Sequence, residues 1–213
     1  NGTPSVQRFS PFNPTASYDT ATIGGSGYFD GSGDYLSVSD NSAFDLNGDF
    51  TVEGWIYYDG ANSNTFIMSG NNGATNKWGF YIYDNYSLTF NFLETAARVE
   101  YGAVTFKWYQ WYHVAATRSG STVSLYLNGN RVATGTLTNT VDCTQAKIND
   151  AIYTSSLKGY LCDVRFVNGT ALYTGSTYTI PTSPLTAVTN TKLLTNMTNA
   201  GIPDSAMMND LET

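Results

Sequence analysis

Charged residues are scarce in this chain. Only 13% of its 213 residues are Asp, Glu, Lys or Arg, so the side chains that favour helices are few. Aromatic residues make up 15%, and Tyr alone occurs 16 times. Together with frequent Gly, Asn, Thr and Ser, this composition favours strands and turns. The length is that of one large all-β domain, which buries enough surface to fold without a metal or a disulfide.

Three further absences exclude classes of function. No apolar run approaches about 18 residues, so we expect no membrane insertion. The net charge is −7, with thirteen Asp and four Glu, and the chain therefore lacks the basic surface that binds nucleic acid. Its Gly-rich segments have turn composition, and none carries the phosphate-cradling pattern of a P-loop or a dinucleotide fold.

Cysteine and histidine are rare as well. Cys143 and Cys162 are the only cysteines, which leaves two interpretations open: two buried free thiols or a single bridge. Without a CxxC motif, and with His113 as the only histidine, a zinc site has no support. No nucleophile motif lies beside His113, so we expect it to have a structural role in a strand.

The clearest local pattern is WYHVAATRSGSTVSLYLNGNRV, residues 111–132. Apolar residues alternate on both sides of Arg118–Ser121, a polar turn in which Gly120 is free to take a positive φ. Asn128–Gly129 is the dipeptide of a type I′ turn, the strongest short-range hairpin signal. The segment therefore predicts three consecutive antiparallel strands, the last beginning near Arg131.

Other segments show the same alternation between turn signals, which predicts a sandwich or barrel. In residues 50–57 both faces carry bulky side chains, which indicates a central strand with neither face open to water. The further strands are expected at residues 35–38, 65–68, 78–83, 88–92, 98–104, 146–148, 157–167 and 192–195. Residues expected in the core are Phe50, Val52, Ile56, Leu88, Phe90, Leu125, Leu127 and Val164.

Several of these strings resemble laminin-G-like domains of the concanavalin A-like lectin/glucanase superfamily. They are YFDGSGDYLSV, FTVEGW, WYHVAATR with VSLYLNG, and the closing strand GYLCDVRF. The resemblance covers roughly residues 24–211 and implies an all-β, two-sheet antiparallel jelly-roll sandwich. We expect residues 1–23 to be an N-terminal arm or linker and residues 24–195 the jelly roll. Residues 196–213 would be a tail that packs on the domain or leads to a further module.

An enzyme on this superfold needs suitably placed acids. Retaining glycosidases use two carboxylates about 5 to 5.5 Å apart. Glu53 is the one Glu in a strong central strand, and its nearest acid, Asp49, falls in the preceding loop. The glucanase pattern E-x-D-x-x-E is absent, so we expect no catalytic residues and no glycosidase activity.

Binding of sugars is better supported by residue type. Aromatic rings stack on the apolar faces of sugars, and Asn and Asp side chains hydrogen-bond to hydroxyls. The alternative is that most of these rings fill the core or a subunit interface. Loops 59–64 and 70–76 are expected to face outward and carry recognition. The candidate ligand-binding residues are Trp78, Tyr81, Tyr83, Trp108, Asn62, Asn64, Asn72 and Asn76, with Tyr109 and Tyr126 as further rings.

The resemblance also implies a structural Ca²⁺ as a candidate cofactor. Related jelly rolls often hold calcium through the Asp of the closing strand, here Asp163, with oxygens near the N-terminal strand. Asp30 and Asp34 are the nearest matching acids. The alternative is a hydrogen-bonded, partly buried Asp163 paired with Arg165.

The ending, YTGSTYTIPTSPLTAVTNTKLL followed by NAGIPDS, is similar to laminin-G-like domains in virion fibre and tail proteins of marine phages. The sequence therefore predicts a non-catalytic recognition module on a phage virion surface that binds a host cell-surface glycan. One alternative is a purely structural decoration domain that contacts neighbouring virion proteins or forms a homo-oligomer. A β-glucanase is the third.

Overall fold

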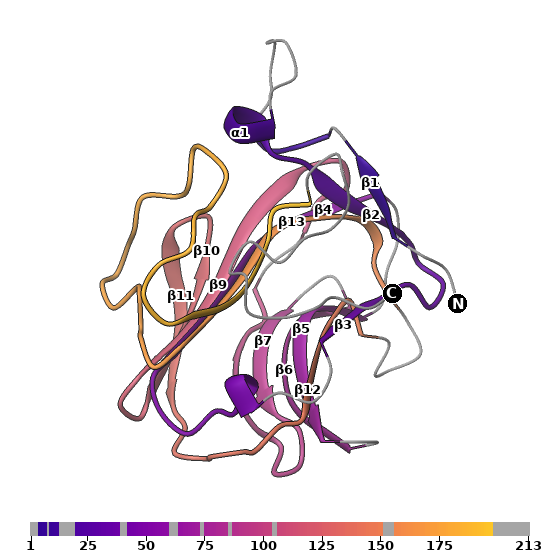
Figure 1. Ribbon diagram of the computed structural model, residues 1–213. Coiled ribbons are helices and arrows are strands. Elements are labelled where there is room, and N and C mark those ends of the chain that lie inside the picture. Colours follow the sequence, from indigo (N-terminus) through magenta and orange to yellow (C-terminus); the bar gives the residue numbers. More distant parts are fainter. Residues whose placement is uncertain are drawn as a thin grey trace.

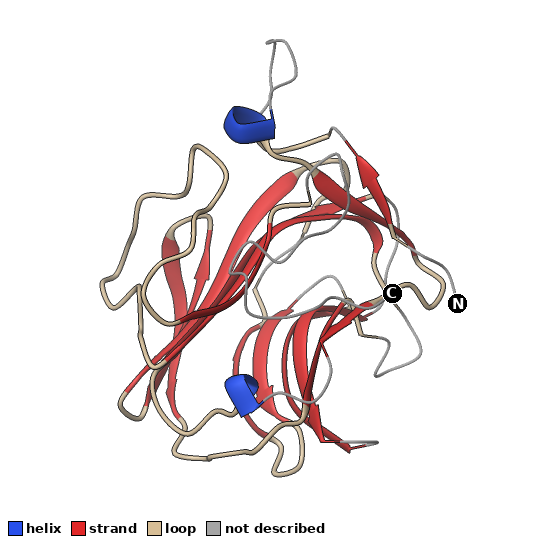
Figure 2. Cartoon of the chain, viewed as in Figure 1, coloured by secondary structure: helices blue, strands red, loops and turns tan. Residues whose placement is uncertain are grey.

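The computed structural model describes residues 4–7, 9–12, 20–38, 42–59, 64–72, 75–84, 87–103, 106–150 and 156–197. Within them the chain forms two antiparallel sheets that pack face to face (Figure 1). Nearly all the regular structure is strand (Figure 2), as the sequence predicts. The fold is an all-β jelly-roll sandwich. Neither helix in these ranges has the length and apolar character to cross a membrane.

The larger sheet has eight strands, and β14 (Thr191–Thr195) pairs with β13 beside the main path. Along that path the order is β1 (Ser5–Gln7), β2 (Ser26–Asp30), β13 (Lys158–Asn168), β4 (Phe50–Tyr58), β9 (Trp111–Ser119), β10 (Thr122–Leu127) and β11 (Asn130–Thr136).

The smaller sheet has six strands. Their order is β3 (Leu36–Val38), β12 (Gln145–Ile148), β5 (Asn64–Asn72), β6 (Thr75–Tyr83), β7 (Ser87–Phe92) and β8 (Ala97–Tyr101). Two short helical turns, α1 (Thr20–Ile23) and a 3₁₀ turn (Ser42–Phe44), complete the regular structure in the described ranges.

The three-strand segment predicted around the Asn-Gly turn is confirmed. β10 pairs with β9 on one side and with β11 on the other. Asn128 has a φ of 47° and Gly129 a φ of 79°, as a type I′ turn requires. Gly120, in the preceding turn, has a φ of 59°.

The core lies between the sheets and contains the side chains that alternation assigns to it. Leu127 is the exception, because it is the last residue of β10 before the turn and is only partly buried against the core. The other seven predicted core residues are fully buried: Phe50, Val52, Ile56, Leu88, Phe90, Leu125 and Val164.

Strand β4 is central, with β13 and β9 as neighbours, and its outward side chains Thr51 and Glu53 are also buried. Their cover is the strap, residues 169–190, which connects β13 to β14 across the outer face of the larger sheet. The Tyr126 hydroxyl donates to the strap carbonyls of Tyr173 and Gly175, at 3.1 and 2.9 Å.

One of the two expected loops needs revision. Residues 70–76 are mostly strand rather than loop, since β5 continues to Asn72 and β6 begins at Thr75. Gly70 serves packing here, because a Cβ on it would lie 2.0 Å from the Trp78 indole nitrogen. Most of the other expected loop, residues 60–63, lies outside the described residues.

The N-terminal segment contributes a short edge strand, in which Ser5–Gln7 pairs with β2. Ser10 donates a hydrogen bond to the carbonyl of Ile23, and Ser26 donates to the carbonyl of Phe9. The segment is therefore anchored on the larger sheet. Residues 198–213 lie outside the described residues, and the domain boundaries proposed from sequence stay a prediction.

Candidate functional site

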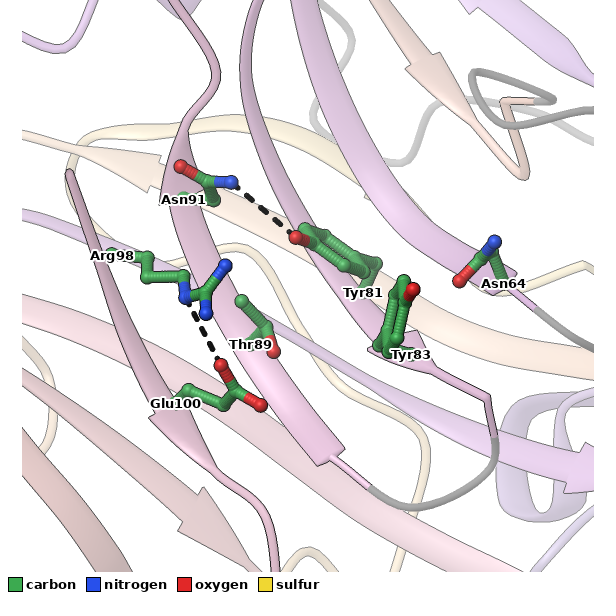
Figure 3. Close-up of a pocket in the computed structure, with 7 residues that line it drawn as sticks. All are labelled: Asn64, Tyr81, Tyr83, Thr89, Asn91, Arg98 and Glu100. Atoms are coloured by element: carbon green, nitrogen blue, oxygen red, sulfur yellow. Dashed lines mark hydrogen bonds and ion pairs between the residues drawn. The ribbon is translucent and has the colours of Figure 1, made fainter. Parts of the chain in front are cut away.

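A pocket of about 400 Å³ opens on the outer face of the smaller sheet, across β5 to β8 (Figure 3). One strand after another contributes to its lining: β5, then β6, β7 and β8. The lining residues are Asn64, Tyr81, Tyr83, Thr89, Asn91, Arg98 and Glu100.

Strand periodicity explains why these side chains share one face. Phe80 and Ile82 point into the core, so the alternate residues of β6, Tyr81 and Tyr83, point outward. The same alternation turns the polar residues of β7 and β8 to this side. The register then aligns Tyr81 with Thr89, and Thr89 with Glu100, in one line across three strands.

Within the described residues, three buried polar atoms of the lining have no hydrogen-bond partner. They are Asn64 Oδ1, Thr89 Oγ1 and Asn91 Oδ1, and each belongs to a residue less than one-tenth exposed. A buried polar atom left unpaired costs about 1 to 3 kcal/mol, and most such atoms in native proteins are paired. The pocket thus has a surplus of hydrogen-bond acceptors, which a bound group with donors would satisfy.

The rim of the pocket is aromatic and charged. Tyr83 is 48% exposed, so one large part of its ring is open to contact. Arg98 Nε lies 3.0 Å from Glu100 Oε2, which neutralises both charges (Figure 3). Glu100 is the one carboxylate among the lining residues, so this pocket has no second acid for the two-carboxylate chemistry of glycosidases.

Three of the residues predicted to bind ligand come together in this pocket: Asn64, Tyr81 and Tyr83. Trp78 does not reach a surface; it is fully buried, and its indole nitrogen donates to the Phe44 carbonyl at 3.3 Å. The sequence interpretation placed Trp78 correctly in a strand but assigned its side chain to the exposed face. Alternation alone does not say which face of a strand packs against the other sheet.

The other candidates lie elsewhere. Asn72 is exposed at the far end of β5 from Asn64, and Trp108 is exposed in the turn before β9. Tyr109 is exposed beside Trp108, whereas Tyr126 is buried beneath the strap. Asn76 is placed on β6, but its side chain and the whole of Asn62 lie outside the described residues.

Sequence reasoning missed four lining residues: Thr89, Asn91, Arg98 and Glu100. A signal for the first pair was present, since they alternate with Leu88, Phe90 and Phe92 in a strand predicted with period two. What was lacking was the strand order, which alone places β7 and β8 beside the tyrosines of β6.

The predicted calcium ligands do not converge. Asp163 is buried in β13, where Asn196 Nδ2 donates to Oδ1 at 2.5 Å and Leu185 N donates to Oδ2 at 3.1 Å. Asp30 pairs with Lys158, five residues before Asp163 on that strand, so the two carboxylates are far apart. Asp34 is buried near the Asp30 end. Across the described ranges, no group of three or more His, Cys, Asp or Glu is placed to hold a metal ion.

Arg165 pairs with Glu53 and not with Asp163, contrary to the alternative raised from sequence. The Arg165 Nε and Nη2 atoms lie 2.9 and 2.6 Å from Glu53 Oε1. Tyr173 of the strap donates to Glu53 Oε2 at 2.7 Å. Burial raises the pKa of Glu53, but the hydrogen bond and charge of His113 and the charge of Arg165 outweigh it, so the pKa is lowered.

His113 has the structural role expected of it. It is fully buried, with Nδ1 2.5 Å from the Tyr178 hydroxyl and Nε2 3.4 Å from Glu53 Oε2. The stacked rings of Tyr173 and Tyr178 cover this cluster. Cys143 and Cys162 are both free and buried, which decides between the two interpretations of the cysteines.

Comparison with solved structures shows the same fold in distant proteins. A Bacteroides ovatus protein provisionally assigned as carbohydrate-binding has a TM-score of 0.61 and 18% identity, over 84% of this chain and 57% of that protein's chain. This chain therefore spans little more than half the length of that protein.

Domain 4 of an extracellular arabinanase from Geobacillus stearothermophilus, solved in complex with arabinotriose, has a TM-score of 0.56 and 15% identity over 79% of this chain and 83% of that one. Domains LG4-5 of the mouse laminin α1 chain have a TM-score of 0.53 and 15% identity, over 75% of this chain and 47% of that one. No curated protein sequence matches this chain.

A family model described as the concanavalin A-like lectin/glucanases superfamily matches residues 30–173. That range begins at the end of β2 and extends into the strap, so it includes the whole smaller sheet, strands β4, β9, β10, β11 and β13 of the larger sheet, and every described residue that lines the pocket. The match agrees with the two-sheet topology and with the structural neighbours. This chain belongs to the concanavalin A-like lectin/glucanases superfamily.

Proposed function

We propose that this chain is a non-catalytic carbohydrate-binding module whose glycan occupies the pocket across β5 to β8. The observation that carries this proposal is the set of three unpaired buried acceptors, Asn64 Oδ1, Thr89 Oγ1 and Asn91 Oδ1. Sugar hydroxyls are donors as well as acceptors, so a sugar ring in the pocket would satisfy all three at once.

The same atoms indicate a neutral glycan. Carboxylate and sulfate groups only accept hydrogen bonds, so they could not pair with the amide oxygens of Asn64 and Asn91, and only the Thr89 hydroxyl could donate to them. The one cation in the lining, Arg98, is already paired with Glu100, and the chain carries a net charge of −7. Tyr83 offers a half-exposed ring on which the apolar face of a sugar would stack.

The pocket supports the non-catalytic part of the proposal. Among its described lining residues Glu100 is the single carboxylate, whereas Glu53 is buried beneath the strap in an ion pair. Two relatives of the same fold are described by their carbohydrate ligands or carbohydrate binding, which supports a sugar as the ligand here.

The location of the module is a separate part of the proposal. The similarity of residues 173–194 and of NAGIPDS to phage fibre and tail domains supports a place on the surface of a phage virion. There the pocket would bind a host cell-surface glycan, while another part of the surface would contact neighbouring virion proteins.

The test is a glycan array of neutral and acidic oligosaccharides, with and without a chelator, followed by calorimetry on the best neutral binder. We expect Thr89→Val to weaken binding about tenfold or more, because it removes one unpaired acceptor at nearly constant volume. It should leave the urea midpoint unchanged or raise it, because a buried unpaired oxygen is lost. Thr134→Val, at an exposed position of β11, is the matched control and should bind normally.

Wild-type affinity in Thr89→Val would overturn the assignment of the pocket. Preferential binding of acidic glycans would overturn the proposed neutral ligand. Loss of binding with the chelator would show that a metal completes the site.

A further inference from the structure

A row of four aromatic residues crosses the outer face of the larger sheet. The register pairs Tyr28 with Tyr160, Tyr160 with Tyr57, and Tyr57 with Trp111. These four residues, here called the aromatic row, therefore lie in one line perpendicular to β2, β13, β4 and β9. Neighbouring strands are about 4.8 Å apart, so the row extends over about 14 Å.

The row is partly open and continues into an exposed turn. All four of its residues are half-buried. Tyr109 lies 6.5 Å from Tyr57 between ring centroids and is 63% exposed, and Trp108 before it is 51% exposed. These are the two most exposed large hydrophobic side chains of the described residues.

The turn that carries these two rings is held in place by hydrogen bonds. Tyr109 N donates to the Tyr58 carbonyl at 2.8 Å, and Lys107 N donates to the Tyr112 hydroxyl at 2.9 Å. Tyr109 has a φ of 62°, a conformation that is uncommon for a bulky residue and is often kept for function. The backbone of this turn is therefore strained at Tyr109, the residue whose ring is exposed.

The row also has unused hydrogen-bond donors. The indole nitrogens of Trp111 and of Trp55, next to it on β4, are buried and have no partner among the described residues. Phe9 of the N-terminal segment packs on Tyr57, Tyr160 and Trp111, with centroid distances of 4.8, 4.9 and 5.3 Å. Phe9 therefore covers part of these three rings and, at 40% exposure, presents its own ring to solvent.

We propose that the aromatic row, together with Phe9, Trp108 and Tyr109, is a second carbohydrate-binding surface for an extended neutral glycan chain. Rings stack on the apolar faces of successive sugars, and sugar oxygens accept from the indole N–H groups. The row is longer than one sugar ring. It lies on the outer face of the other sheet, and the observations that carry it are independent of the pocket.

A protein partner fits these observations less well. The buried centre of a protein interface is expected to pair its polar groups. Here the two indole N–H groups beside the row have no hydrogen-bond acceptor among the described residues. A polyanionic glycan is disfavoured by the net charge of −7.

The experiment is native affinity electrophoresis of the whole chain in gels that contain laminarin, arabinan, xylan or mannan. Four proteins are compared: the wild type, Trp108→Ala/Tyr109→Asn, the pocket variant Tyr83→Ala/Thr89→Val, and the combination of all four changes. Asn tolerates the left-handed conformation at position 109, so the fold should persist. Val188→Ala, an exposed apolar position on the strap, is the matched control.

We expect Trp108→Ala/Tyr109→Asn to weaken the apparent affinity about tenfold in at least one gel. The combined variant should then migrate as in a gel without polysaccharide, while the pocket variant keeps residual retardation. If only the pocket variant migrates as the wild type does, the assignment of the pocket as a glycan site is rejected and the second surface is retained.

The proposal is overturned if Trp108→Ala/Tyr109→Asn migrates as wild type in every gel, or if no polysaccharide retards the wild type. It is also overturned if sedimentation shows that the same variant dissociates a dimer, because the row would then be an interface between copies of this chain.

Discussion

At the residue scale, Asp163 is a carboxylate that the fold keeps away from water. It is fully buried at an irregularity in β13, with a φ of 50°. Burial raises its pKa from 3.8 to about 7, although the hydrogen bonds from Asn196 and Leu185 oppose this. In the unfolded chain the same group ionises near pH 4, so the folded state retains its proton over a wider pH range.

This difference predicts that part of the stability is present below about pH 4 and is lost as the pH rises to about 7. The loss for this one group is at most roughly 4 kcal/mol. Glu53 acts in the opposite sense: its pKa is lowered, so its contribution is lost as the pH falls below 4.5. Urea unfolding at pH 4.5 and pH 7.5 should therefore show that Asp163→Asn removes most of the decrease between these values.

The exposed Asp30 of β2 provides the control. Asp30→Asn should keep the pH dependence of the wild type. A pH profile for Asp163→Asn that parallels the wild type would show that Asp163 ionises normally in the folded chain.

At the element scale, the β10–β11 hairpin depends on glycine for two separate reasons. Gly129 has a positive φ, and a Cβ on it would also lie 2.5 Å from the Tyr178 carbonyl oxygen of the strap. Gly120 has a positive φ too, but a Cβ there would have no neighbour within 4 Å. Valine at either position adds backbone strain, and only at 129 does it also displace the strap.

We therefore expect Gly129→Val to cost more than about 1 kcal/mol of unfolding free energy, and more than Gly120→Val costs. The urea midpoints and slopes of both variants measure this difference. Equal losses would mean that the strap does not press on the turn.

The two leucines of β10 give a second prediction at this scale. Leu125 is fully buried and Leu127 only half-buried. Leu125→Ala should cost roughly 2 to 5 kcal/mol, because it leaves a cavity between the sheets, and Leu127→Ala should cost clearly less. Thermal and urea unfolding of the pair measure this, and the reverse order would mean that the turn end of β10 is packed more tightly than its middle.

Local sequence was sufficient for most strands because period two, Asn-Gly and similar turn signals act over a few residues. It was not sufficient for the candidate site. Arg98 and Glu100 reach the pocket only because β8 pairs with β7, a contact between segments that carries no local signal. The Gly70-Asn-Asn composition favoured a loop, yet pairing of β5 with both β12 and β6 made it strand.

At the scale of the whole molecule, the pocket and the aromatic row lie on the outer faces of opposite sheets. One glycan chain cannot readily engage both, so a single protein molecule should bridge two glycan chains. If both proposals hold, the wild-type protein should cross-link a neutral polysaccharide and raise the turbidity of its solution. Either Tyr83→Ala/Thr89→Val or Trp108→Ala/Tyr109→Asn alone should abolish turbidity while leaving some binding. Turbidity that survives in both variants would require self-association instead.

The strap has a further consequence for how the larger sheet meets solvent. Strand β11 is an edge, and an open edge invites pairing with the same strand of another copy, a route to aggregation. The chain covers the start of this edge with its own backbone: Arg131 N donates to the Ser176 carbonyl, and Tyr178 N donates to the Gly129 carbonyl, both at 2.8 Å. The opposite side of the sheet ends in β1, which is three residues long, and in β14, which is five residues long and pairs with β13. Cutting the strap should therefore uncover the β11 edge, and the expected result is pairing of β11 between copies of the chain rather than a more flexible monomer.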